Sequence, residues 1–270
     1  MPIVTSLHIY PIKSCRGIDL TEVELDDRGP RGDRRWMVVD ARNDFYSQRN
    51  RPALALVRVA LTDGGVAVEA PGMPRLEVRT PEMHGDDFVA DVWGSEAPVR
   101  PANDEAHHWF TRYLGSPARL VYLPDDSVRI MKREYAGAIA APRRVTLNDG
   151  APLLLTAEES LEELNRRLDA PLRMNRFRPN VVIRGAGPFA EDAWTRIRVG
   201  MVTFEVAKPC ARCATTTVEQ ESAVRGKEPL RTLATFRRGT DGVLFGQNVA
   251  HHAPGSLRVG DDVVVLGTRD

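Results

Sequence analysis

The segment with the most chemical potential is Lys208-Pro-Cys-Ala-Arg-Cys-Ala-Thr-Thr-Thr217, where two residues separate Cys210 from Cys213. A thiolate is a soft ligand that suits a thiophilic transition metal. The cations Lys208 and Arg212 lie close in the sequence, and nearby positive charge favours the thiolate over the thiol. The segment therefore predicts that one of these cysteines is a metal ligand at the end of a strand.

Three other interpretations of this pair stay open. A structural zinc site usually needs a second ligand pair, and the only candidates are His107-His108 and His251-His252, whose adjacent side chains point to opposite faces on a strand. A thioredoxin-type pair opens a helix, whereas the threonines that follow Cys213 favour extended chain. Buried and inert cysteines are the third interpretation.

Four further segments offer cations and hydroxyls. In Arg176-Phe-Arg-Pro-Asn180, Pro179 predicts an extended Arg178 at the mouth of a buried strand, where its guanidinium can present a rigid fork to a phosphate. On an alternating strand, either Arg34 or Arg35 must face inward. Singly, each segment is more typical of a surface turn than of a site. The other three are Tyr10-Pro-Ile-Lys-Ser-Cys-Arg-Gly17, Gly32-Asp-Arg-Arg-Trp36 and Ser47-Gln-Arg49.

Composition limits the classes of protein that fit. The 270 residues suffice for one large or two modest domains, and 42% hydrophobic with 27% charged residues is typical of a globular protein. Lysine plus arginine equals aspartate plus glutamate, so no global field favours nucleic acid or a membrane surface, and an anion site must be a local cluster. No run approaches the ~20 apolar residues of a membrane span. We expect no nucleic-acid partner, no membrane and a cytoplasmic location.

Short alternating runs predict a mainly β (α+β) fold made of two β-barrel-like units with a few packed helices. A polar stretch at 124–142 places the boundary, which gives units 1–123 and 124–270. Strands are expected at 5–10, 35–40, 53–61, 66–70, 76–79, 88–92, 119–123, 180–184, 196–206 (a hairpin), 243–249 and 263–266.

Helix signals are fewer. Asn103 and Gly115 predict the cap and the stop of a helix over 103–114. Thr156 and Glu159 form a capping-box pattern for a second helix. A third helix is expected over 228–238, with Pro229 in its first turn.

Taken in order, these segments resemble the MOSC superfamily with its N-terminal β-barrel domain. YPIKSCRG and DRRWMVVD look like the N-terminal domain, and NRFRPNVVIRG, PCARCATTTV, KEPLRTLATFRR and LFGQN look like the MOSC domain. The resemblance covers nearly the whole chain, and it is to the group that includes the mitochondrial amidoxime-reducing component and its bacterial relatives.

The resemblance implies a molybdenum cofactor of the molybdopterin form, and the site would lie at the interface of the two units if they close on each other. The cysteine that ends the CxRC motif, here Cys213, would be the molybdenum ligand and the catalytic residue, with Cys210 as a neighbour. Arg49 would join the cationic cluster that meets the charge of the cofactor. Ala151 replaces a serine of some relatives, which removes one hydroxyl. The same motif matching implies further cofactor contacts at Lys13, Ser14, Arg34, Asp149, Arg178, Asn180, Ala211, Arg212 and Asn248.

The implied activity is the reduction of N-hydroxylated small molecules, namely amidoximes, hydroxylamines and N-hydroxylated bases, with release of water. Three cysteines are too few for an iron–sulfur cluster, which usually takes four ligands, so the electrons would come from a separate donor protein of the ferredoxin, flavodoxin or cytochrome type. A superfamily-level label, pyridoxal phosphate binding, comes with the same resemblance.

Two rival functions stay open. In one, the protein is a sulfur carrier or cofactor-handling protein that uses a persulfide on Cys213, with the thiol activated by Arg212. In the other, it is a binding module that has lost its chemistry.

Overall fold

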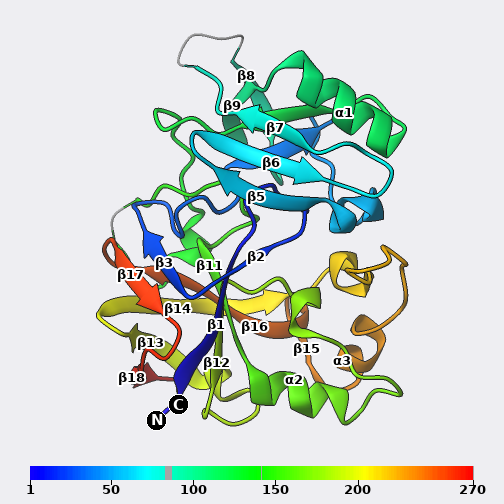
Figure 1. The fold of residues 1–270 in the computed structure, drawn as a ribbon. Helices are drawn as coiled ribbons and strands as arrows, with labels where there is room; N and C mark the ends of the chain where they lie inside the picture. Colours follow the sequence, from blue (N-terminus) through cyan, green and yellow to red (C-terminus); the bar gives the residue numbers. More distant parts are fainter. Residues whose placement is uncertain (83–86, 141, 270) are drawn as a thin grey trace.

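Two β-rich units lie one above the other (Figure 1), with three α-helices packed against them in the part of the chain that is described. The structure is a computed structural model, and it describes residues 1–82, 87–140 and 142–269. The mainly β fold expected from the alternating sequence pattern is confirmed.

The upper unit is built from antiparallel strands. One sheet joins β5 (Arg58–Thr62), β6 (Gly65–Glu69) and β7 (Leu76–Arg79). The other has the order β4 (Trp36–Val39), β10 (Arg119–Tyr122), β9 (Glu96–Pro101) and β8 (Phe88–Asp91).

Helix α1 (Asp104–Leu114) covers this unit and begins and ends as predicted. The Asn103 side chain accepts a hydrogen bond from the amide of Ala106 at 3.1 Å, and Gly115 ends the helix with a φ of 62°. A glycine tolerates this left-handed conformation at no steric cost. Trp109 and Phe110 bury the apolar side of the helix in the core of the unit.

Among the described residues, the lower unit contains a sheet of nine strands. Strand β15 pairs with β16 at its margin, and α2 (Glu158–Asn165) and α3 (Leu230–Phe236) lie beside the sheet (Figure 1). The order is β18 (Val263–Thr268), β13 (Trp194–Val199), β14 (Val202–Ala211), β16 (Gly242–His251), β11 (Leu153–Ala157), β12 (Val181–Arg184), β1 (Ile3–Ile9) and β2 (Ile18–Leu20), with β15 at Arg238–Gly239.

The start of the chain belongs to the lower sheet. Strand β1 pairs with β12, β2 pairs with β1, and β3 (Glu22–Leu25) pairs with β17 (Gly255–Arg258). After β3 the chain enters the upper unit, which the loop between β1 and β2 already contacts, since Ile12 and Cys15 are part of that unit's core. The predicted boundary between 123 and 124 stays a prediction, but the loop between β1 and β2, at 10–17, is thereby placed where the two units meet.

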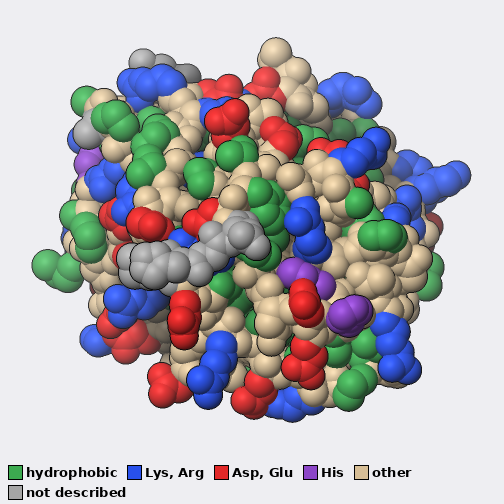
Figure 2. All heavy atoms as spheres, turned by 90° about the horizontal axis from the view of Figure 1, so that it is seen from above, with side chains coloured by type: hydrophobic (Ala, Val, Ile, Leu, Met, Phe, Trp, Pro, Cys, Tyr) green, Lys and Arg blue, Asp and Glu red, His purple; other side chains and the backbone are tan. Residues whose placement is uncertain are grey.

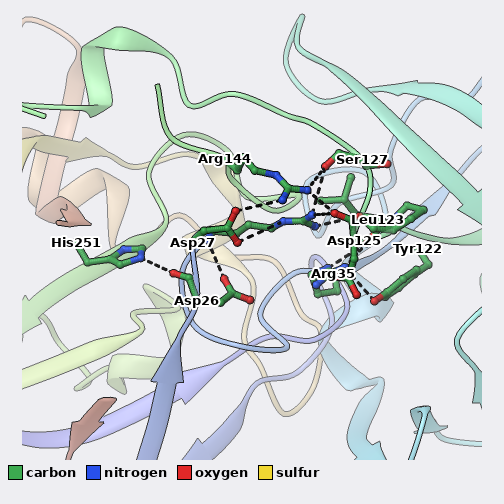
Figure 3. Close-up of polar contacts among 11 residues, drawn as sticks. Asp26, Asp27, Arg35, Tyr122, Leu123, Asp125, Ser127, Arg144 and His251 are labelled. Carbon is green, nitrogen blue, oxygen red and sulfur yellow. Dashed lines mark hydrogen bonds and ion pairs between the residues drawn. The ribbon is translucent and has the colours of Figure 1, made fainter. Parts of the chain in front are cut away.

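Arginine side chains form hydrogen bonds with the segment 123–127, which connects the two units (Figure 3). Arg35 and Arg144 donate to main-chain carbonyls of the segment 123–127, and Arg144 also pairs with Asp27 at 3.2 Å. The ring of His251, at the end of β16, lies 2.7 Å from the carbonyl oxygen of Asp26. Backbone groups of the connection are thus paired with side chains from both units, which satisfies their hydrogen-bonding capacity.

Three predicted elements need correction. Residues 53–61 do not form one strand, because Pro52–Leu56 make a 3-10 turn and β5 starts at Arg58; a proline fixes φ and suits a first helical turn. Thr156 lies inside β11 and is no helix cap, because pairing with β12 extends that strand to the start of α2. The third helix is shorter than predicted, at Leu230–Phe236.

The surface agrees with the balanced composition. Side chains of both signs are interspersed over the face seen in Figure 2. Within the described residues, no helix combines the length and the apolar character needed to cross a bilayer.

Candidate active-site pocket

A cavity of about 380 Å³ lies between the two units, and residues of both line it. The loops around Lys13, Arg34 and Arg49 line the cavity from the side of the upper unit. From the lower unit come the loop before β11, the turn before β12 and the end of β14. All of the predicted site residues line this cavity: Lys13, Ser14, Arg34, Arg49, Asp149, Arg178, Asn180, Ala211, Arg212, Cys213 and Asn248. Their individual roles stay predictions.

Backbone strain is concentrated in this pocket. Among the described residues, seven that are not glycine have a positive φ, and four of these line the cavity: Ser14 (69°), Arg34 (46°), Trp93 (58°) and Arg178 (55°). Such conformations persist only where the surrounding structure enforces them, and they cluster at functional sites. The expectation that Pro179 makes Arg178 extended is therefore wrong. The turn that precedes Arg178, Met174–Arg176, carries the chain into the left-handed region instead.

Arg178 is a buried cation with spare hydrogen-bonding capacity. Its side chain packs over the ring of Tyr10 at 4.1 Å, and its Nη1 donates to the carbonyl oxygen of Cys15 at 2.7 Å. Its Nη2 has no hydrogen-bond partner among the described residues. Burial lowers the pKa of Arg178 to about 10, so the guanidinium stays charged at neutral pH. A buried, unpaired N–H of this kind favours an anionic or accepting ligand.

Arg34 is held from two sides. Its Nη1 donates to Asp33 and, at 3.2 Å, to Oδ1 of Asn180, and its guanidinium packs over Tyr10 at 4.7 Å. Burial by itself would lower the pKa of Arg34, but the Asp33 carboxylate outweighs it and raises the pKa. Arg35 points elsewhere, to the carbonyl of Leu123, which settles which of the two arginines faces the pocket.

The Asn180 amide is already engaged by the protein. Its Nδ2 donates to the carbonyl of His8 and to Asp33, and its Oδ1 accepts from Arg34 and from the amide of Leu154. These four bonds use the full capacity of a carboxamide. Asn180 therefore fixes the arrangement of strand β12 and Arg34, and a direct cofactor contact would have to replace one of these bonds.

Lys13 and Asp149 form an ion pair in the lining of the pocket. The Lys13 ammonium is buried and donates to the Leu147 carbonyl at 2.8 Å as well as to Asp149. Burial lowers the pKa of Lys13, although Asp149 acts in the opposite direction. Burial would raise the pKa of Asp149, but Lys13 outweighs it and holds that pKa below its usual range. The carboxylate itself is 64% exposed, toward the open part of the cavity.

Cys210 lies near the end of β14, and Cys213 follows that strand. Cys213 is exposed and lines the cavity, whereas Cys210 is half-buried. Arg212 directs Nη1 to the sulfur of Cys210 at 2.8 Å and Nη2 to the carbonyl of Phe177 at 2.6 Å. The expected pairing of Arg212 with Cys213 is therefore not seen.

The threonines after Cys213 do not extend the chain as predicted. Ala214–Thr217 form a 3-10 turn, because the hydroxyls of Thr216 and Thr217 donate to carbonyls three residues back. Within the described residues, no group of three or more histidine, cysteine or acidic side chains that could hold a metal ion is found, which a zinc site would have required.

Asn248 is positioned by the strand that carries it. Its Nδ2 lies 3.3 Å from the carbonyl oxygen of Lys208 on the neighbouring strand β14. Two residues earlier, Gly246 has a φ of 77°, and a Cβ there would lie 2.8 Å from the carbonyl oxygen of Leu155. The glycine of the FGQN motif is thus required by the close approach of β11.

Sequence reasoning missed an aromatic part of the wall. Phe45, Trp93 and Tyr135 line the cavity, and the buried Asn148 lies beside Asp149. The one local signal in the sequence was the dipeptide Trp93-Gly94, because a glycine typical of a tight turn follows a residue that such turns disfavour. Loops far apart in the sequence bring these side chains together, so no spacing could reveal them.

The residues present fit a molybdopterin-type group. Such a group carries a phosphate and sulfur-bound metal, so it needs fixed cations at one end and an accessible thiolate at the other. Arg178 with its unpaired Nη2, together with Arg34 and Lys13 nearby, provides the fixed cations. The exposed thiol of Cys213 provides the accessible thiolate.

Comparison with known proteins gives the class first. Residues 1–117 match the MOSC N-terminal beta barrel domain, and residues 142–264 match the MOSC domain. The chain thus contains both domains of a MOSC protein.

Curated relatives narrow this class. Mitochondrial amidoxime-reducing component 1 of Mus musculus is 33% identical over 279 residues, which cover 98% of this chain and 82% of that protein. Mitochondrial amidoxime reducing component 2 of Rattus norvegicus is 34% identical, covering 96% and 82%, and component 1 of Homo sapiens is 31% identical, covering 98% and 83%. The chain belongs to the MOSC family, in the group of the amidoxime-reducing components.

Proposed function

We propose that this protein is a molybdenum-cofactor-dependent reductase of N-hydroxylated small molecules. The observation that carries the proposal is the pocket itself, in which the exposed Cys213, the buried Arg178 and the partly buried Arg34 line one cavity. The names of the relatives specify amidoxime reduction. None of the domains and relatives named above refers to pyridoxal phosphate, so that label is not part of the proposal.

In this proposal the protein contributes binding and orientation. When bound, the cofactor supplies the two-electron chemistry that cleaves an N–O bond. An amidoxime would take up two electrons and two protons to give an amidine and water. Cys213 would hold the metal, and Arg34, Arg178, Lys13 and Arg49 would meet the negative charge of the pterin phosphate. A separate ferredoxin-, flavodoxin- or cytochrome-type protein would deliver the electrons, and a cytoplasmic location stays a prediction.

The test is metal analysis combined with a reductase assay. Protein made in a host that synthesises the cofactor is measured for molybdenum and pterin, and benzamidoxime reduction is followed with a chemically reduced dye as donor. We expect stoichiometric molybdenum and turnover in the wild type, and loss of both in Cys213→Ala. Cys210→Ala is the matched control and should retain the metal. A molybdenum-loaded wild type that leaves benzamidoxime unchanged would contradict the proposed activity.

A sulfur-carrier function is the second candidate, because Cys213 is an exposed free thiol. A persulfide adds one sulfur atom to the mass of the intact protein. Mass spectrometry that finds this addition on Cys213, in protein without molybdenum, would favour the carrier over the reductase.

A further inference from the structure

The hairpin between β8 and β9 carries a residue that its backbone disfavours. The amides and carbonyls of Val92 and Ser95 pair with each other at 2.9 and 3.2 Å, which leaves a two-residue turn made of Trp93 and Gly94. Both have a positive φ, 58° and 73°. Turns of this type favour Asn-Gly, and a bulky residue there is an outlier. A residue that the local backbone conformation disfavours, located beside a pocket, indicates that its side chain has a function.

The indole of Trp93 is held in place but not covered. The Arg49 guanidinium packs against it at 3.9 Å, and the ring of Phe45 meets it nearly edge-on at 5.3 Å. Trp93 is nevertheless 41% exposed and lines the cavity. A large aromatic surface that the protein leaves open is available for a ligand.

The neighbours of the indole are themselves fixed. The side chain of Arg49 is within hydrogen-bonding distance of the Ser47 hydroxyl at 3.3 Å, and Phe45 packs under the Lys13 ammonium at 4.9 Å. A ligand that stacks on Trp93 would therefore order few side chains on binding, which favours selective recognition.

We propose that Trp93 is a specificity-determining residue that stacks on the planar ring of aromatic N-hydroxylated substrates. This inference rests on the proposed function and assigns a residue to one part of its substrate range, the substrates that carry a planar aromatic ring. Arg49 on the indole strengthens the platform, since a cation over an aromatic face is attracted to it. Short aliphatic substrates have no ring to stack and gain nothing from Trp93.

The experiment compares two substrates across matched variants of the molybdenum-loaded protein. Trp93→Asn gives the turn its preferred Asn-Gly sequence, so the fold should melt at the same or a higher temperature than the wild type. Trp93→Phe keeps an aromatic face. Val89→Thr changes an exposed residue of β8 in the same hairpin, outside the described pocket lining. Benzamidoxime and acetamidoxime are compared for KM, and benzamidoxime binding is also measured by calorimetry without a donor.

We expect Trp93→Asn to weaken benzamidoxime binding and raise its KM roughly tenfold, as the loss of one aromatic stack implies, with acetamidoxime unchanged. Trp93→Phe should retain most of the wild-type affinity for benzamidoxime, and Val89→Thr should match the wild type for both substrates. Equal effects on both substrates, no effect, or a loss of molybdenum in Trp93→Asn would overturn the inference. A wild type that binds benzamidoxime through Trp93 but reduces neither substrate would refute the proposed function and leave the stacking role standing.

Discussion

The inner and outer parts of the pocket are built differently. Inside, Arg178 is buried, and Arg34, whose side chain is 14% exposed, packs against the same Tyr10 ring; a main-chain carbonyl holds Arg178 and a carboxylate holds Arg34. At the rim, Arg49 is half-buried and held mainly by stacking on Trp93. Rigid, permanently charged groups suit one invariant partner, such as the cofactor. A stacked and partly exposed pair suits partners that vary, such as substrates.

Tyr10 shows how strongly the inner part is enclosed. Burial raises the pKa of its hydroxyl to about 12, against the opposing effect of Arg178 and Arg34. Its hydroxyl donates to the carbonyl of Pro179 at 3.0 Å, so the ring that supports both arginines is itself fixed. The position of the inner cations is therefore set before any ligand arrives.

The largest effect is expected for Arg178→Met, which tests the inner part. Loss of a buried charged donor should reduce cofactor retention roughly 10- to 100-fold. The melting temperature should change little, since removing an incompletely paired buried cation offsets the lost bond to Cys15. Pterin and molybdenum content are measured beside thermal unfolding. A folded Arg178→Met variant that retains all of its cofactor would contradict the proposed difference between the inner and outer parts of the pocket.

A smaller effect is expected for Arg49→Met at the rim. The lost cation is partly solvated, so cofactor retention should fall only about threefold to tenfold, and the difference should shrink in high salt. The melting temperature should match that of the wild type. If this variant loses as much cofactor as Arg178→Met, the rim is part of the rigid site.

The smallest effect concerns Asp149→Asn, which removes one half of the ion pair with Lys13. Because the folded-state pKa of Asp149 is depressed, its carboxylate stabilises the fold at neutral pH, and this contribution fades as the pH falls below the ordinary range of an aspartate. The group is largely exposed, so we expect a melting temperature lower by about 1–3 °C at pH 7.

The control for this last variant is its pH dependence. Differential scanning fluorimetry from pH 7 down to pH 4 and below should show the gap between Asp149→Asn and the wild type closing toward the acidic end. A gap that widens as the pH falls would mean that Asp149 does not act through its charge.

The sequence by itself determined the β-rich class, the thiol at Cys213 and the cationic segments, because motif identity and alternation are local properties. It also fixed helix α1, whose cap at Asn103 and stop at Gly115 lie next to the residues they control. Local signals failed where sheet pairing prevailed: Thr156 has the pattern of a cap but lies in a central strand.

Only the tertiary structure decided which of these segments share a site. The pairing of β1 with β12 brings the loop of Lys13 to that of Arg178, which is 165 residues later in the chain. The choice of Arg34 over Arg35, the left-handed turn at Arg178 and the open indole of Trp93 all depend on contacts between distant segments. Such contacts are set by packing and long-range strand pairing, and no spacing within a single segment encodes them.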